Sequence, residues 1–535
     1  MTSIHIVPKI NQIELQPRGE YSLGPESLLC FPADCPRAGR LLMKMTGLKT
    51  QTASDPGGAI RLEFDQQVQQ DEGYVLTIDA AGVLIRAKSD RGLFYGVQSL
   101  RQLLPASIET TGIVAPVVLP YMRIEDAPRF AYRGFMLDEA RHFFGMQAVK
   151  RVLDLLALQK LNKFHWHLSD HQGWRIEIKK YPKLTEIGSR RSKTQRNGLL
   201  ALKAVYDHQE VSGFYTQAQI REIVAYAADN FIDVIPEIDL PGHSTAALAA
   251  YPELSCDGMA VEVGVDVGLA SFYSLPKLVC AGKEASFTFL QNVLDELIEL
   301  FPARTIHLGS DEAGKKVWQN CPDCQARIKE QGLKDENELQ DYFINRLARH
   351  VFDQGCAVIG WNDGLFAHSD DRIIIQNWFH AYKETIQKIK AGQKAIMSPM
   401  ASYYLNIPFR VSSLKQSYLY EPHVPELTEK EAHNILGVEA PYWTEFVNNR
   451  AKLEWGMFPR LLAISETAWT ERNNKNYEDF ENRLAVLELR LDQLGVSHTS
   501  PLCYKKYRQF SNPLSFIFGL MDDPDREFKA YTKSA

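Results

Sequence analysis

The spacing of hydrophobic and polar positions divides the chain into two parts. Up to about residue 128, apolar and polar residues alternate in short runs such as Ile60–Phe64 and Tyr74–Ile78. A period of two residues is typical of half-buried antiparallel strands. The segment 93–104 instead has leucine and valine at helical spacing, which predicts one helix lying on that sheet. Pro116, Pro120 and Pro128 then indicate an extended linker.

From residue 131 onward, short and nearly continuous apolar runs alternate with amphipathic segments, the pattern of buried parallel strands covered by helices. The predicted helices include Gln147–Lys160 and Thr216–Asp229, and the second opens with a Thr-x-x-Gln capping box. The eight apolar runs are Tyr132–Leu137, Lys163–Leu168, Phe231–Ile235, Thr305–Leu308, Ala357–Gly360, Ile373–Gln376, Ala395–Met397 and Ile435–Val438. Eight alternating units predict a closed barrel.

The predicted fold class is therefore α/β: a (β/α)8 TIM barrel preceded by a smaller α+β domain with an antiparallel sheet and a helix. We expect the N-terminal domain over residues 1–128 and the barrel over 129–499. Residues 476–495 would form a last amphipathic helix, and 500–535 a tail that packs on the barrel or is partly disordered. The connections after Asp170 and Met397 are unusually long and are expected to wall the active site.

Composition narrows the class of partner. The 535 residues include 60 basic and 66 acidic side chains, which are interspersed and give a net charge of −6. No basic stripe favours nucleic acid or an anionic membrane, so a neutral small molecule or glycan is expected. The N-terminus lacks the pattern of a secretory signal and no run is apolar enough to span a bilayer, so a cytoplasmic location is expected unless a leader was removed.

Eight cysteines are scattered along the chain, which favours reduced thiols over a disulfide framework. Cys321-Pro-Asp-Cys324 is a single CxxC motif. A zinc ribbon would need a second such pair at a set spacing, which the sequence lacks. We therefore interpret these residues as loop thiols and expect no metal and no cofactor.

Polar and aromatic residues follow the predicted strands, where the catalytic groups of such barrels lie. In strand order they are Asp138 and Arg141; His167 and Asp170; Glu237, Asp239 and His243; Asp311 and Glu312; Trp361; Trp378; Tyr404 and Asn406; Trp443 and Glu445. Each alone has an ordinary structural interpretation, such as a core tryptophan or a helix-capping acid. Because they converge at one rim, they predict a sugar site, in which charged groups bind hydroxyls and aromatic faces stack on the ring.

Four motifs resemble glycoside hydrolase family 20, the β-N-acetylhexosaminidases. They are Arg133-Gly-Phe-Met-Leu-Asp138-Glu-Ala-Arg141, Phe164-His-Trp-His-Leu-Ser-Asp170, Pro236-Glu-Ile-Asp-Leu-Pro-Gly-His243 and His307-Leu-Gly-Ser-Asp311-Glu312. The resemblance continues, in family order, through Trp361-Asn-Asp, Gln376-Asn-Trp378, Tyr404-Leu-Asn406 and Trp443-Thr-Glu445, and the N-terminal part is similar to the domain that precedes the barrel there. It covers nearly the whole chain.

The resemblance implies hydrolysis of terminal β-linked GlcNAc or GalNAc with retention, the sugar's own acetamido group acting as nucleophile. Adjacent acids cannot easily flank a sugar, but they can serve one substrate from one side. Glu312 would protonate the leaving oxygen and later deprotonate water, while Asp311 would hold the acetamido N–H and stabilise the oxazolinium. Asp170 and His243 would form a relay that orients Glu312 and tunes its pKa.

The resemblance also implies the binding residues. Tyr404 would donate a hydrogen bond to the acetamido oxygen, Trp361, Trp378 and Trp443 would surround the acetyl methyl and the ring, and Arg141, Asn406 and Glu445 would bind ring hydroxyls. Two residues depart from the family pattern. Ser310 stands where glycine is expected, and Asn406 stands where many members carry aspartate. The second departure leaves open how the 6-hydroxyl of the sugar is recognised.

Two other function classes remain open. His165 and His167 lie on one side of a strand and, with His243 and an aspartate, would suit a metal-dependent hydrolase on the same barrel. A catalytically silent carbohydrate-binding protein would keep the aromatic residues but normally loses the acid, and Glu312 is present. The preference for GlcNAc or GalNAc, the aglycone, release of mono- or disaccharide and the oligomeric state are not set by the sequence.

Overall fold

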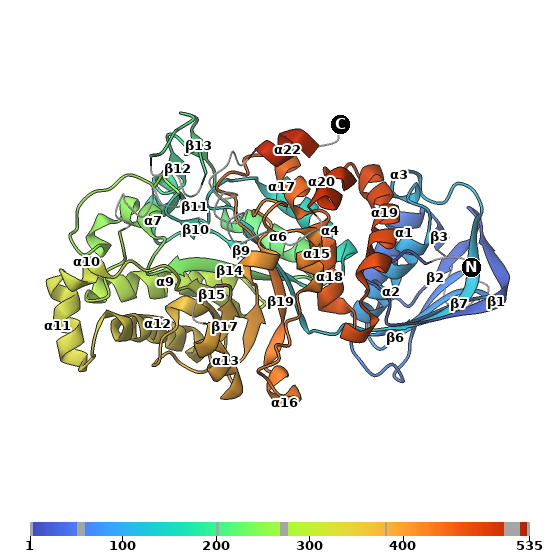
Figure 1. Ribbon diagram of the computed structural model, residues 1–535, viewed down its shortest axis with the longest axis horizontal. Helices are drawn as coiled ribbons and strands as arrows, with labels where there is room; N and C mark the ends of the chain where they lie inside the picture. Colours follow the sequence, from blue (N-terminus) through green and yellow to red (C-terminus); the bar gives the residue numbers. More distant parts are fainter. Residues whose placement is uncertain are drawn as a thin grey trace.

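The computed structural model describes residues 4–50, 59–198, 203–267, 277–379, 382–507 and 525–531. It shows a sheet-based N-terminal domain beside a closed barrel (Figure 1). The predicted fold class is confirmed: a smaller α+β domain precedes an eight-stranded parallel barrel.

The N-terminal sheet has seven strands in the order β1-β7-β5-β6-β4-β2-β3. The strands are β1 Gln12–Leu23, β2 Leu28–Cys30, β3 Lys49–Thr50, β4 Ile60–Phe64, β5 Tyr74–Asp79, β6 Gly82–Ala87 and β7 Val117–Asp126. The sheet is mixed rather than purely antiparallel, since β4 pairs in parallel with both β6 and β2. The alternating pattern could not show this, because half-buried strands alternate in either orientation.

Two further features of this domain differ from the sequence-based expectation. The proline-marked segment is largely the strand β7, not a linker, and Pro120 lies where the pairing of β7 with β1 changes register. Proline is tolerated at such irregularities because no ladder hydrogen bond is lost there. The predicted helix is α2, Asp90–Leu103, and it is accompanied by α1, Pro36–Thr46, and the short α3, Ile108–Thr111.

All eight predicted apolar runs supply barrel strands. They are β8 Tyr132–Asp138, β9 Lys163–His167, β14 Asp233–Leu240, β15 Thr305–Gly309, β16 Ala357–Trp361, β17 Ile374–Asn377, β18 Ala395–Met397 and β19 Ile435–Tyr442. Each pairs in parallel with its neighbours, and β19 closes the barrel against β8. Their carboxyl ends therefore open at the same end of the barrel.

Helices surround the barrel (Figure 1). The predicted helices correspond to α4 Met146–Leu158, α6 Gln217–Asp229 and α19 Tyr477–Gln493, and the capping box of α6 is formed by Thr216 and Gln219. The others are α5 Lys183–Glu186, α7 Thr245–Ala250, α9 Glu284–Leu300, α10 Lys316–Gln319, α11 Pro322–Gln331, α12 Glu336–Asp353, α13 Tyr382–Lys390, α14 Met400–Tyr403, α15 Leu414–Leu419, α16 Glu429–Ala432, α17 Arg450–Met457, α18 Arg460–Trp469, α20 Pro501–Lys506 and α22 Arg526–Tyr531.

The two long connections contain structure of their own. Two short hairpins follow β9: β10 Ser169–Asp170 with β11 Gly173–Trp174, and β12 Arg190–Arg191 with β13 Val211–Ser212. The connection after Met397 carries α14, α15 and α16. Residues 199–202, within the first connection, lie outside the described part of the chain.

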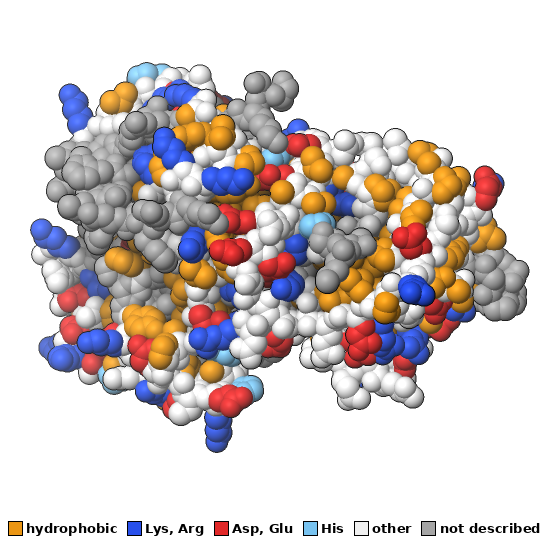
Figure 2. Space-filling model, turned by 45° about the vertical axis from the view of Figure 1, so that its right-hand side comes forward, with side chains coloured by type: hydrophobic (Ala, Val, Ile, Leu, Met, Phe, Trp, Pro, Cys, Tyr) orange, Lys and Arg blue, Asp and Glu red, His pale blue; other side chains and the backbone are white. Residues whose placement is uncertain are grey.

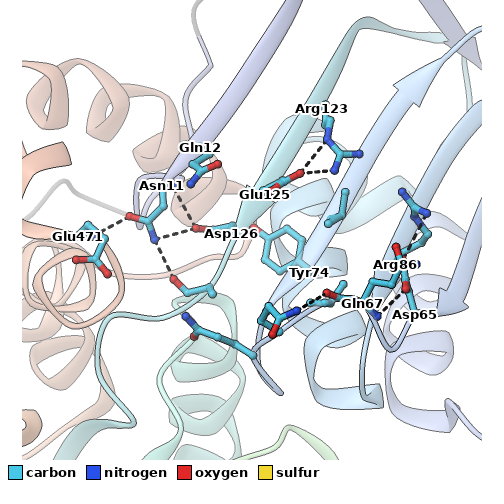
Figure 3. A pocket seen from close by; sticks show the side chains of 16 residues that line it. Asn11, Gln12, Asp65, Gln67, Tyr74, Arg86, Arg123, Glu125, Asp126 and Glu471 are labelled. Atoms are coloured by element: carbon cyan, nitrogen blue, oxygen red, sulfur yellow. Dashed lines mark hydrogen bonds and ion pairs between the residues drawn. The ribbon is translucent and has the colours of Figure 1, made fainter.

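The two domains meet at a buried carboxylate. Asp126, the last residue of β7, accepts hydrogen bonds from Tyr74 in its own sheet (2.7 Å), from Lys160 after α4 (3.1 Å) and from Trp469 at the end of α18 (2.9 Å). Asn11 also donates to Asp126, and Figure 3 shows Asn11, Tyr74 and Asp126 lining a cavity of about 510 Å³. Charged groups lining that cavity pair with one another, as Arg123 does with Glu125 and Arg86 with Asp65.

The described parts of the C-terminal tail contact the barrel. The Glu527 carboxylate accepts hydrogen bonds from the backbone N–H groups of Phe409 (2.7 Å) and Arg410 (3.1 Å). The Ser500 N–H donates to the Tyr531 carbonyl. The predicted tail also includes residues 508–524 and 532–535, which lie outside the described residues.

The molecular surface agrees with the balanced composition. On the face drawn in Figure 2, acidic and basic side chains are interspersed over both domains. Among the described helices, none combines the length and apolar character that crossing a bilayer requires.

Candidate active site

All the predicted site residues come to the same end of the barrel, because each lies at or just after the carboxyl end of a parallel strand. They are Arg141 after β8, Asp170 after β9, His243 after β14, Asp311 and Glu312 after β15, Trp361 at the end of β16, Trp378 after β17, Tyr404 and Asn406 after β18, and Trp443 and Glu445 after β19. The local contacts show which of them lie together.

Four aromatic residues form one apolar cluster at this end. Trp361, Tyr404 and Trp443 are buried in it, and Trp378 packs against them while remaining partly exposed. The Trp378 and Tyr404 rings are stacked with centroids 6.0 Å apart and 16° between their planes. Trp443 lies 6.0 Å from Trp361 and 6.3 Å from Tyr404. Such a cluster offers flat apolar faces to a sugar ring or an acetyl methyl.

Hydrogen bonds fix the orientation of two of these rings. Trp361 Nε1 donates to Glu237 at 2.8 Å, and Trp378 Nε1 donates to Asp363 at 2.8 Å. Because an indole has a single donor, each carboxylate determines which edge of its ring faces the site.

A buried polar network supports this cluster from inside the barrel. Glu237 accepts hydrogen bonds from Trp361 and His167, and lies 3.1 Å from ring nitrogens of both His165 and His307. Burial would raise the pKa of Glu237, but the three histidines hold it well below its ordinary value. Buried carboxylates are tolerated only when paired in this way.

Sequence reasoning missed part of this network. Glu439 on β19 accepts hydrogen bonds from His165, Tyr132 and Gln376 inside the barrel. A charged residue in the middle of the apolar run Ile435–Tyr442 was the available signal, because an unpaired charge would not be tolerated there.

The acidic pair sits on a strained turn after β15. Gly309, Ser310 and Glu312 have φ angles of 66°, 96° and 47°. Residues other than glycine rarely adopt such backbone angles, and each such residue costs of order 1–3 kcal/mol. The turn explains why glycine was expected at position 310. Ser310 is held there by its Oγ, which donates to the Trp361 carbonyl at 3.1 Å, and by its N–H, which donates to Asp239 at 3.2 Å.

The turn gives the two neighbouring acids different environments. Asp311 is buried, and no donor among the described residues reaches its Oδ1 atom. The Glu312 side chain is 47% exposed. A buried carboxylate oxygen without a partner is costly unless a ligand donor satisfies it. Asp311 is therefore placed to accept a hydrogen bond from a bound molecule.

Ionisation also differs between the two acids. Burial, together with the neighbouring charge of Asp239, raises the pKa of Asp311 well above its ordinary value. Burial acts in the same direction on Glu312, but His243 outweighs it and lowers the pKa of Glu312. Environments that move the pKa values of two carboxyls apart are typical of acid–base sites.

His243 connects Glu312 to a buried carboxylate. Its Nδ1 lies 3.2 Å from Asp170 and its Nε2 lies 3.6 Å from Glu312 and 3.8 Å from Asp311. Burial would lower the pKa of His243, but Asp170 and Asp239 raise it well above its ordinary value. Its protonated ring thus lies between Asp170 and the exposed acid.

Asp170 is itself held in its ionised form. Arg141 Nη2 lies 2.7 Å from Asp170, and His167 Nε2 lies 3.0 Å away on the same oxygen. Burial would raise the pKa of Asp170, but Arg141 and His243 hold it well below the ordinary range. The Arg141 guanidinium also stands 3.5 Å from Asp138 and 4.8 Å from the centre of the Trp443 ring.

Polar groups on the other side of the aromatic cluster border a cavity of about 80 Å³, whose lining includes Asn406, Trp443 and Glu445. The Asn406 Oδ1 atom is buried without a hydrogen-bond partner among the described residues. Burial raises the pKa of Glu445 to about 7, although Arg141 acts to lower it. Amide and carboxyl groups of this kind can exchange hydrogen bonds with hydroxyls.

Tyr404 remains a hydrogen-bond donor. Burial raises the pKa of its hydroxyl well above the ordinary value, so the group keeps its proton throughout the physiological pH range.

Comparison with known proteins agrees with this geometry. Residues 130–472 match the model of the glycosyl hydrolase family 20 catalytic domain, and residues 3–127 match that of glycosyl hydrolase family 20 domain 2. A beta-hexosaminidase of Porphyromonas gingivalis is 38% identical over 470 residues, which cover 85% of this chain. They cover 58% of that relative, so the chain spans little more than half of its length.

Two solved structures have a similar fold. A beta-N-acetylhexosaminidase from Bacteroides fragilis is 30% identical with a TM-score of 0.80, covering 95% of this chain and 99% of that one. An exo beta-N-acetylglucosaminidase from Vibrio harveyi, in complex with N-acetylglucosamine, is 29% identical with a TM-score of 0.81, covering 93% of this chain and 78% of that one.

Proposed function

Because the chain belongs to glycosyl hydrolase family 20, we propose that it is a retaining exo-β-N-acetylhexosaminidase, which removes terminal β-linked GlcNAc or GalNAc by substrate-assisted catalysis. The observation that carries this proposal is the environment of Asp311. Its Oδ1 atom is buried without a partner among the described residues, and the aromatic cluster of Trp361, Tyr404 and Trp443 lies at the same end of the barrel. An acetamido N–H is the donor that this acceptor suits.

The roles of the two acids follow from their positions. Asp311 accepts the acetamido N–H, turns the carbonyl oxygen toward the anomeric carbon and stabilises the positive charge of the oxazolinium. Tyr404 donates to the same carbonyl oxygen. The raised pKa of Asp311 in the free protein falls as this positive charge develops next to it, so the interaction strengthens along the reaction.

Glu312 is the general acid and then the general base. In the free protein its pKa is lowered, and the proton resides on His243, 3.6 Å away. Bound sugar excludes water from the exposed face of Glu312, which favours its neutral form. His243 then delivers the proton to Glu312, and Glu312 passes it to the leaving oxygen. Asp170 holds the positive charge on His243 before this transfer.

The remaining residues bind the sugar ring. Trp361, Trp378 and Trp443 contact the acetyl methyl and the ring face, while Arg141, Asn406 and Glu445 bind hydroxyls. N-acetylglucosamine bound to the Vibrio harveyi enzyme supports a monosaccharide of this class as the ligand here.

The rival function classes make different use of the same residues. In a metal-dependent hydrolase His165 and His167 would face an open coordination position, yet their ring nitrogens contact Glu237, Glu439 and Asp170. In a silent binding protein the strained turn that presents Glu312 would have no use, and Glu312→Gln would abolish nothing.

The test replaces each acid by its amide. Glu312→Gln and Asp311→Asn are each expected to lower kcat/KM for an aryl β-GlcNAc at least about 100-fold, the usual contribution of a positioned acid or base. Glu384→Gln, at an exposed acid of α13, is the matched control and keeps full activity.

Azide then distinguishes the two roles. It should restore turnover to Glu312→Ala with a good aryl leaving group, because azide replaces water without needing a base, and it should not rescue Asp311→Ala. Normal turnover by either amide variant would refute the assigned roles.

A further inference from the structure

Four of the eight cysteines meet at one point outside the candidate active site. Cys280 Sγ lies 3.7 Å from Cys321 Sγ and 3.6 Å from Cys324 Sγ, and Cys256 Sγ lies 3.9 Å from Cys324 Sγ. All four sulfur atoms lie within 4.8 Å of one another. Cys280, Cys321 and Cys324 are buried, and Cys256 is partly exposed. The interpretation of Cys321 and Cys324 as loop thiols did not include this convergence of four sulfur atoms.

The sulfur–sulfur distances are those of a metal-centred tetrahedron. Four thiolates at about 2.3 Å from a zinc ion are separated along each tetrahedral edge by about 3.8 Å. The three measured distances, 3.6 to 3.9 Å, lie on both sides of this value. Disulfide sulfurs would lie about 2.05 Å apart. Cys280 and Cys324 each approach two other sulfurs, and neither can form a disulfide with both.

Contacts of the surrounding backbone, which do not involve the sulfur atoms, position the cysteines. Cys321 caps the N-terminus of α11 and Cys324 lies in its first turn, where the positive end of the helix favours thiolates. The Cys280 N–H donates to the Leu254 carbonyl at 2.8 Å. Gly282 lies so close to this turn that a Cβ atom there would come within 2.2 Å of the Asp323 backbone.

A buried tryptophan ties the same segments together. Trp318 Nε1 donates to the Val279 carbonyl at 3.1 Å, next to Cys280, and the Trp318 carbonyl accepts from the Cys321 N–H. The positions of Cys280 and Cys321 are thus defined by backbone hydrogen bonds, as expected of preorganised ligands.

We propose that Cys256, Cys280, Cys321 and Cys324 bind one structural zinc ion. Four protein ligands leave no open coordination position, so the ion binds no substrate. It joins two loops. Cys256 and Cys280 belong to the connection after β14, which contains His243, and Cys321 and Cys324 belong to the connection after β15, which contains Asp311 and Glu312. The ion therefore fixes the loop that carries the relay to the loop that carries the acids.

Metal content tests this proposal directly and independently of hydrolysis. The full chain, made in zinc-supplemented medium without a metal-binding tag, should contain about one zinc per chain by inductively coupled plasma mass spectrometry. The double variant Cys321→Ser/Cys324→Ser should contain none. The matched control is Cys356→Ser, a buried cysteine at the start of β16, outside the cluster, which should keep its zinc.

A second measurement applies even if the double variant fails to fold. Cobalt exchanged into the unmutated chain should give the intense visible absorption and the thiolate charge-transfer bands of a tetrahedral sulfur site. Titration of the zinc form with an organomercurial should release the metal as the thiols react.

Four results would overturn the proposal. Three of them are a native chain with less than about 0.1 zinc per molecule, an intact mass lowered by the four hydrogens that two disulfides remove, and zinc retained in the double variant at the level of the control. One equivalent of iron in place of zinc would equally contradict it.

Discussion

Asp239 affects the ionisation of Asp311 and His243 in the candidate site, although it does not lie at the entrance of the site. Its Oδ1 accepts the Ser310 N–H at 3.2 Å, and its Oδ2 is buried without a hydrogen-bond partner among the described residues. Burial raises the pKa of Asp239 itself to about 7, and in its ionised form Asp239 raises the pKa of both Asp311 and His243. The pH dependence of hydrolysis should therefore report on a residue that does not contact the sugar.

We predict that Asp239→Asn shifts the acid limb of kcat/KM to lower pH by roughly one unit. Asp311 must be ionised to accept the acetamido N–H, so activity is lost as the pH falls through its raised pKa. Removal of the neighbouring charge lowers that pKa and preserves activity into more acidic buffer. The alkaline limb should move in the same direction, because the pKa of His243 also falls.

The measurement is the pH profile of kcat/KM for an aryl β-GlcNAc, with Asp371→Asn on the surface as control. An acid limb that stays in place, or moves to higher pH, would contradict the assigned coupling between Asp239 and Asp311.

At the scale of single residues, the sequence predicted which side chains converge but not how they are paired by hydrogen bonds. The strand-end positions of Asp311, Glu312 and the tryptophans followed from the apolar runs, since parallel strands end together. The unpaired Oδ1 of Asp311 and the buried Glu439 did not follow, because pairing depends on contacts between residues far apart in sequence.

Among the elements, barrel strands were easier to predict than those of the N-terminal sheet. A strand buried on both faces is an uninterrupted apolar run, so all eight were visible. The strand β7 resembled a linker because Pro120 interrupts it at a change of register. Its last residue, Asp126, has an equally non-local role, since its four partners come from separate segments of the chain.

We predict that Asp126→Ala lowers the free energy of unfolding by about 3–5 kcal/mol, because it leaves the fully buried Lys160 ammonium without its counter-charge. Heat or urea unfolding followed by tryptophan fluorescence measures the loss. The double variant Asp126→Asn/Lys160→Met should recover part of it, since neither buried charge remains.

A surface ion pair provides the comparison. The side chains of Arg190 and Glu210 are more than half exposed, and their charged groups lie 3.0 Å apart. Glu210→Ala should therefore leave the midpoint of the unfolding transition almost unchanged. An Asp126→Ala protein that is as stable as Glu210→Ala would show that this carboxylate does not join the two domains.

In the whole molecule, the N-terminal domain and the barrel form one unit around Asp126, and two barrel loops meet at the cysteine cluster. No spacing pattern along the chain indicates that cluster, because only two of its members form a CxxC motif. Cys256 and Cys280 come singly from the preceding connection, so no spacing rule detects them. A contact between loops that are far apart in the sequence is the feature that is hardest to predict from a single sequence.

In the proposed mechanism the substrate's acetamido group, and not a protein carboxylate, attacks the anomeric carbon. The most direct test compares kcat/KM for an aryl β-GlcNAc with that for the matching aryl β-glucoside, which differs only at the 2-position. We predict that the glucoside is cleaved at least about 1,000-fold less efficiently, because it lacks the intramolecular nucleophile. Comparable cleavage of the two sugars would contradict the account.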